Sequence, residues 1–159
     1  MELLDLLKHD VRKPARYRGG EFFPAGFRAP EKGDLKVALV YPDLYEIGMS
    51  NTGLRILYSM LLRQKGIYVD LAFTPWPDME GAMRSAGEKL TSRHGNIPLG
   101  EFDVLGFSLQ FELNYSNVLT VLDLAGLPLR AAERDDTAPL VIAGGPCATH
   151  CEPMVPFLD

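Results

Sequence analysis

Cys147, His150 and Cys151 put two thiols and an imidazole into one short segment, and these are side chains that bind metals. A closed zinc site needs a fourth ligand and a different spacing of its ligand pairs. We therefore assign no metal site to this chain, and nothing in it marks a catalytic residue.

Polar side chains and glycines gather instead in three segments, each of which follows an apolar run. These segments are PDLYEIGMSNTG (42–53), SLQFELNYSN (108–117) and GGPCATH (144–150). Asp43, Glu46, Ser108 and Gln110 offer hydrogen-bonding groups, and the pair Gly144–Gly145 lets a ligand approach the backbone closely. Each has a structural alternative, because Asp43 could cap a turn and Ser108 could bond the backbone at the end of a strand. We expect these loops to form a binding site.

The familiar motifs of α/β enzymes are missing. The first apolar run, 35–41, is followed by Asp43 and Glu46 rather than by the G-x-G-x-x-G of a dinucleotide fold. There is no G-x-x-x-x-G-K-[ST] phosphate loop and no G-x-S-x-G nucleophile elbow. A phospho-acceptor would need an Asp where Ser108 stands, since Asp103 lies at the other end of that run. A nucleotide or sugar-phosphate ligand is accordingly the weakest of the alternatives.

Apolar runs and helical periodicity alternate from residue 35 onward. Strands are expected at 35–41, 68–74, 102–109 and 139–143, and helices around 54–62, 79–86 and 117–126. This alternation predicts an α/β fold with a doubly wound, mainly parallel sheet, Rossmann-like or flavodoxin-like. Ligands bind such sheets outside the carboxyl ends of the strands, where the strand order reverses. If the first strand is central and the third lies beside it, all three polar loops face one crevice.

Two domains of different character are predicted. Residues 1–34 are rich in Pro, Gly and Arg and form an N-terminal arm, whose aromatic residues indicate that it packs on something. Those residues are Tyr17, Phe22, Phe23 and Phe27. Residues 35–159 form the α/β domain, and we expect it to be cut before its last strand. The segment 87–100 has no clear pattern.

Composition narrows the choice of partners and compartment. The net charge of −5 makes nucleic-acid binding by bulk charge unlikely. No apolar run has the roughly 18–20 residues needed to cross a bilayer. Acidic residues Glu2, Asp5 and Asp10 do not fit a signal peptide, and two cysteines give no disulfide framework. We predict a cytoplasmic protein that does not bind membranes, and the sequence gives no oligomeric state.

The three loops resemble a known pattern. Cobalamin-binding domains carry D-x-H-x-x-G after the first strand, S-x-L at the end of the third and G-G after the fourth. Here Asp43 and Gly48 flank Tyr45, which stands in place of the histidine; Ser108 keeps the serine, and Gly144–Gly145 matches the last motif. Longer segments that include these loops, such as YPDLYEIGMSNTGLRILY and PLVIAGGPCATHCEP, are similar to the N-terminal region of a family of B12-binding-domain radical SAM proteins. The similarity covers most of residues 13–159.

The resemblance implies a sheet of the cobalamin-binding-domain type and a set of cofactor-binding residues. These are Asp43, Tyr45, Glu46, Gly48, Ser108, Gln110, Gly144 and Gly145. It implies cobalamin as the ligand, bound without a histidine, because a phenol with a pKa near 10 is a poor substitute for imidazole on cobalt. It also implies a radical SAM barrel in the same full-length protein, with a [4Fe–4S] cluster and S-adenosylmethionine, beyond the residues of this chain.

Two functions follow for the segment itself. The first is a cofactor-binding module, not catalytic alone, that serves the radical SAM barrel of its parent enzyme. The alternative is a non-catalytic interaction or scaffold domain of the same fold that has lost its ligand.

Overall fold

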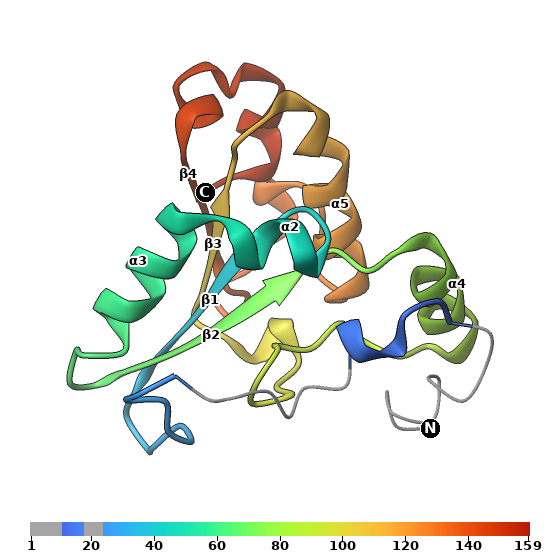
Figure 1. The fold of residues 1–159 in the computed structure, drawn as a ribbon. Helices are drawn as coiled ribbons and strands as arrows, with labels where there is room; N and C mark the ends of the chain where they lie inside the picture. The colour runs from blue at the N-terminus through green and yellow to red at the C-terminus, as the bar shows by residue number, and fades with distance from the viewer. Residues whose placement is uncertain (1–10, 18–23) are drawn as a thin grey trace.

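A four-stranded parallel sheet forms the centre of the computed structural model, which describes residues 11–17 and 24–159 (Figure 1). Its strands are β1 (Leu35–Tyr41), β2 (Ile67–Phe73), β3 (Val104–Ser108) and β4 (Leu140–Gly144). They lie in the order β2-β1-β3-β4, and all three neighbouring pairs are parallel. This confirms the predicted doubly wound α/β fold. The strand order reverses at β1, so the switch point lies between β1 and β3.

The strand register brings the carboxyl ends of the strands to one edge. Tyr41 at the end of β1 pairs with Phe73 at the end of β2, and Ser108 at the end of β3 pairs with Gly144 at the end of β4. The loops that follow β1, β3 and β4 therefore start at the same edge of the sheet, as the sequence predicts.

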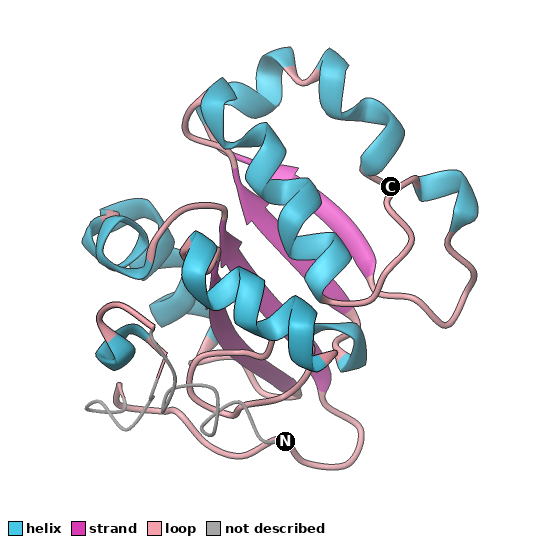
Figure 2. Cartoon of the chain, turned by 90° about the vertical axis from the view of Figure 1, so that its right-hand side faces the viewer, coloured by secondary structure: helices cyan, strands magenta, loops and turns pink. Residues whose placement is uncertain are grey.

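The strands are apolar on both faces because each face packs on helices. On one face, residues such as Val40, Phe107 and Val141 join a core with α4 (Pro77–Ala86) and α5 (Tyr115–Leu124). On the other face, Leu39 and Leu71 pack with α3 (Thr52–Leu61). Figure 2 shows the strands between these helical layers.

The helices begin and end where local sequence signals indicate. The short helix α2 (Tyr45–Ser50) follows β1, and α3 starts after Asn51, whose side chain accepts a hydrogen bond from the Leu54 N–H at 2.8 Å. Asn51 is therefore the N-cap of α3. Helix α4 has Pro77 in its first turn and ends at Gly87, which has a φ of 70°.

Six short 3₁₀ helices complete the described part of the chain. They are η1 (Pro14–Arg16), η2 (Leu99–Glu101), η3 (Glu112–Asn114), η4 (Ala131–Glu133), η5 (Pro146–His150) and η6 (Glu152–Phe157). Beyond η6, the Asp159 N–H donates to the Val141 carbonyl at 2.9 Å, so the chain returns to β4.

The patternless segment 87–100 is organised by one buried carboxylate. Asp70 on β2 is fully buried and accepts hydrogen bonds from the backbone N–H groups of His94 and Gly95 and from the Tyr68 hydroxyl. A buried carboxylate needs such donors, and here the two backbone N–H groups come from a loop that contains no helix or strand. This explains why no helical or strand period marks the segment.

The N-terminal arm packs on the domain in the part that is described. The Tyr17 hydroxyl accepts a hydrogen bond from the Trp76 N–H at 3.0 Å, and Asp78 accepts one from the Arg12 N–H at 2.7 Å. Phe22 and Phe23 lie outside the described residues. The division of the chain at residue 34 and the cytoplasmic location stay predictions. Across residues 11–17 and 24–159, no helix has the length and apolar character that crossing a membrane requires.

Candidate functional site

A cavity of about 390 Å³ lies between α3 and the neighbouring strands β3 and β4. It is bounded by β1 at the switch point and by the turn that follows β4. Its lining residues are Leu39, Gly53, Leu54, Leu57, Gly106, Phe107, Ser108, Gln110, Ile142, Ala143, Gly144 and Gly145. None of these side chains is charged. Ser108, Gln110 and the glycine pair thus share one apolar cavity at the expected edge.

Two glycines keep the sheet side of the cavity open. A Cβ atom at Gly144 would meet no atom within 4 Å, and one at Gly106 would lie 3.6 Å from a methyl group of Leu39. Helix α3 packs on β1 and β2, so this face of β3 and β4 has no helix over it within the described residues. Leu57 and Ile142 consequently remain exposed on the two sides of the cavity.

Ser108 supplies the polar group of the cavity, and Gln110 orients it. The Gln110 side-chain amide donates to the Ser108 hydroxyl oxygen at 3.0 Å. The backbone carbonyl of Gln110 accepts a hydrogen bond from the Cys147 thiol at 3.3 Å. Because the Ser108 oxygen already accepts a hydrogen bond, its own O–H is available to donate to a ligand.

Gly145 has a structural reason to be glycine. Its φ is 104°, and a Cβ atom would lie 2.6 Å from the Leu109 carbonyl oxygen. The same carbonyl accepts the Cys147 N–H at 3.1 Å, while the Leu109 N–H donates to Gly144 at 2.7 Å. These bonds hold the turn after β4 tightly against the end of β3, and so close one end of the cavity.

The predicted residues of the first loop do not line this cavity. Asp43 accepts from the Leu44 N–H at 2.7 Å and from the Asn114 side chain at 3.2 Å, so it ties the start of α2 to the loop after β3. Tyr45 lies edge-on against Phe73, with ring centres 5.5 Å apart, and under the guanidinium of Arg93 at 4.4 Å.

Glu46 and Gly48 also make internal contacts. Glu46 pairs with Arg16 at 2.8 Å and with Lys13 at 3.5 Å, and both cations come from the arm. Burial opposes ionisation of Glu46, but hydrogen bonds to its own N–H and to Arg16, with the two positive charges, leave its pKa below the ordinary value. A Cβ atom at Gly48 would lie 2.4 Å from the Phe73 ring, so the glycine allows α2 to pack on β2.

The eight predicted residues therefore fall into two groups. Four surround the cavity, and the four of the first loop position α2 and the arm. Sequence reasoning missed Gly53, Leu57, Gly106 and Ile142, which also line the cavity. Gly106 carries a readable signal, because a glycine inside an apolar strand often marks a close approach.

The Cys147–Cys151 segment comprises most of η5 and the residue that follows it. Among the described residues, no group of three or more His, Cys, Asp or Glu side chains is arranged to hold a metal ion. The Tyr115 hydroxyl donates to the carbonyls of Cys147 and His150, which fixes the turn. Burial, together with the charge of Glu112, raises the pKa of the Cys147 thiol, which therefore stays protonated at neutral pH.

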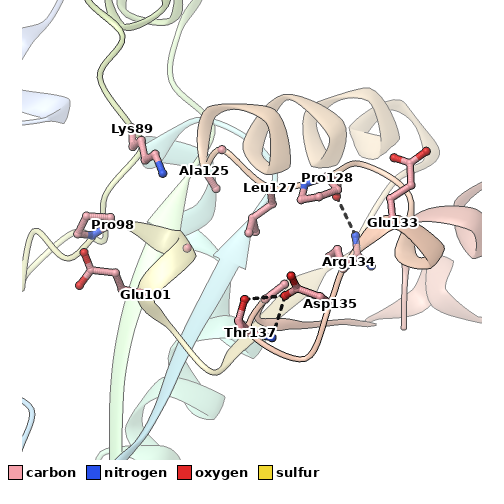
Figure 3. A pocket seen from close by; sticks show the side chains of 13 residues that line it. Lys89, Pro98, Glu101, Ala125, Leu127, Pro128, Glu133, Arg134, Asp135 and Thr137 are labelled. Carbon is pink, nitrogen blue, oxygen red and sulfur yellow. Dashed lines mark hydrogen bonds between the residues drawn. The ribbon is translucent and has the colours of Figure 1, made fainter.

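A second cavity, of about 360 Å³, lies at the opposite edge of the sheet, among the segments that precede β3 and β4 (Figure 3). Arg134 on its wall donates to the Pro128 and Leu129 carbonyls, and Thr137 donates to Asp135 and lowers the pKa of that carboxyl. These polar groups are engaged with each other. Because ligands bind doubly wound sheets at the carboxyl ends of the strands, the cavity beside Ser108 is the candidate site.

The fold and this cavity define the class of the chain: a doubly wound α/β domain with a cavity at its switch point. The family model described as "Radical SAM proteins, N-terminal" matches residues 53–159, and the chain belongs to this family. Membership implies a [4Fe–4S] cluster and S-adenosylmethionine in the parent protein. Searches of curated proteins and of solved structures found no match.

Proposed function

We propose that this chain holds a cobalamin-like cofactor for a radical SAM barrel in the same protein, and that the cavity beside Ser108 receives the base of that cofactor's nucleotide tail, with its phosphate outside. One observation carries the proposal. Ser108, Gln110, Gly144 and Gly145, four of the eight predicted cofactor-binding residues, meet around a single cavity at the switch point of the sheet.

The cavity suits a flat, uncharged group that carries a hydrogen-bond acceptor. Its walls are apolar side chains, including Leu54, Leu57 and Ile142, and its glycines admit a ring close to the backbone. The Ser108 hydroxyl can donate to a ring nitrogen. A nucleotide whose phosphates enter the cavity would meet no cation there, which disfavours the sugar-phosphate alternative.

The first loop offers no ligand to cobalt. Tyr45, in the place of the histidine of cobalamin-binding domains, is held by Phe73 and Arg93. A bound cobalamin would supply cobalt chemistry such as alkyl transfer, which no side chain of this chain can provide. The role of the residues that line the cavity is to bind the tail, to exclude water from it and to orient the rest of the cofactor toward the barrel.

Titration with hydroxocobalamin tests the proposal. We expect the corrin absorption spectrum to change and the ligand to co-elute with the chain. Gly144→Leu would fill the cavity without a backbone clash, because the space beside Gly144 is open, and should abolish binding. Gly81→Leu is the matched control, since Gly81 on α4 also faces open space but is remote from the cavity. Both variants should keep the circular dichroism spectrum of the parent chain.

The alternative, a scaffold domain without a ligand, has one observation in its favour. Leu113 and Phe111 in the loop after β3 are 90% and 60% exposed, although buried Asn114 fixes that loop by donating to the Pro42 carbonyl at 2.6 Å. A firmly held loop that displays apolar side chains suits contact with another protein. No spectral change and no co-elution with the folded chain would favour this alternative.

A further inference from the structure

Helix α3 displays large apolar side chains on the side away from the sheet. Its inner face buries Leu54 and Tyr58, as expected of a surface helix. Its outer face should then be polar. Instead Ile56 and Met60 are 54% and 58% exposed, and they lie one turn apart on that face. An apolar stripe of this kind on both sides of a helix indicates that the outer side is covered by a partner.

The same face is positively charged in an acidic chain. Residues 52–65 contain Arg55, Arg63 and Lys65 and no Asp or Glu, whereas the whole chain has 21 acidic and 16 basic residues. All three cations are exposed. None of them makes an ion pair within the described part of the chain, unlike Arg28 and Arg84. Their charge is available to a partner.

A shallow hollow of about 520 Å³ joins these groups. It is lined by Thr52, Arg55, Ile56, Ser59, Met60 and Arg63. Arg55 lies on α3 and Arg63 lies two residues beyond its C-terminal end, so the eight residues from one to the other span roughly two helical turns. The apolar side chains of Ile56 and Met60 and the hydroxyl of Ser59 lie between them.

We propose that the outer face of α3 binds an amphipathic helix of a partner protein whose apolar stripe is bordered by carboxylates about two turns apart. The carboxylates pair with Arg55 and Arg63, and the stripe covers Ile56 and Met60. A second copy that packed this face on its own equivalent would bring like charges together. A bilayer is flat and would leave the hollow unfilled, so a helix fits better than an anionic membrane.

Two labelled helical peptides of equal length test the proposal by fluorescence anisotropy. Both carry a leucine stripe, bordered by Glu in one and by Lys in the other. We expect the Glu peptide to bind the chain, more weakly as salt rises, and the Lys peptide not to bind. The double variant Arg55→Glu/Arg63→Glu should weaken binding at least about tenfold. Ile56→Ser/Met60→Ser should weaken it without changing the charge. Arg130→Glu, at an exposed arginine outside α3, should leave it unchanged.

Other results would overturn the proposal. Equal binding of the two peptides would show that charge does not determine binding. No binding at about 1 mM peptide would show that this face does not bind such a helix. A dimer that Arg55→Glu/Arg63→Glu converts to monomer would show that a second copy covers the face. Binding to phosphatidylserine vesicles without binding of the Glu peptide would assign the face to a membrane.

Discussion

The Gln110 side chain donates a hydrogen bond of 3.0 Å to the hydroxyl of Ser108, two residues earlier, at the carboxyl end of β3. Both side chains line the same cavity. This bond uses one of the two lone pairs of the serine oxygen, so the O–H can still donate into the cavity. A ligand with an acceptor atom beside Ser108 would receive that hydrogen bond.

Gln110→Ala should therefore weaken the binding of hydroxocobalamin by about fivefold, the effect of losing one hydrogen bond of about 1 kcal/mol. The free energy of unfolding should change little, since Gln110 is only partly buried. Absorbance titration measures the affinity. Gln64→Ala, at an exposed glutamine after α3, serves as the control. An affinity equal to that of the parent chain would show that Gln110 does not orient Ser108.

The neighbouring glycines Gly144 and Gly145, at the end of β4, should respond differently to substitution by alanine. Gly145 has a φ of 104°, and the new Cβ would lie 2.6 Å from the Leu109 carbonyl oxygen. Gly145→Ala should lower the free energy of unfolding by about 1–3 kcal/mol. Gly144→Ala meets open space and should be close to neutral. Urea unfolding measures both, and equal effects would contradict this account of the turn.

The fold was predictable from sequence because strand and helix periods alternate from residue 35 onward, except in the segment 87–100. The 3₁₀ helices were not, since short turns carry little periodic signal. The segment 87–100 is ordered by hydrogen bonds to Asp70, which is distant in the chain. A contact of that kind leaves no local trace in the sequence.

The candidate site was predictable only in part. Loop order and strand ends place Ser108 and Gly144 together, as the register shows. The motif pattern alone does not show which of its residues share one cavity, and Tyr45 and Gly48 lie outside the cavity that Ser108 and Gly144 line. Tyr45 and Gly48 both contact Phe73, whose position depends on how β2 pairs with β1.

The packing of Gly48 on Phe73 predicts a loss of stability on substitution. Gly48→Ala would place a Cβ atom 2.4 Å from the Phe73 ring and 3.0 Å from the Tyr41 Cβ, so the ring must move. Overpacking of this kind should cost about 1–3 kcal/mol in urea unfolding. Combined with Phe73→Leu, the substitution should cost less than it does alone. Strictly additive effects of the two changes would show that the ring is not the obstacle.

Stability at low pH should depend on Asp34. Its carboxylate accepts hydrogen bonds from Arg28 at 2.5 and 2.8 Å and from the Glu31 N–H at 2.7 Å, and these lower its pKa from 3.8 to about 2. Because the folded pKa lies below the unfolded one, the ionised group stabilises the fold above a pH of about 4. That contribution is lost as the pH falls from about 4 through about 2, where the folded state also takes up the proton.

Asp34→Asn should thus reduce the fall in the free energy of unfolding between a pH of about 4 and about 2, measured by urea titration at each pH. Asp136→Asn is the control, because Asp136 is exposed and makes no ion pair within the described part of the chain. It should leave the pH profile as it is. A profile that Asp34→Asn does not flatten would mean that the Arg28 pair persists in the unfolded chain or adds nothing to the fold. Added salt should shrink the difference between the two variants, since the Arg28 side chain of the pair remains partly open to solvent.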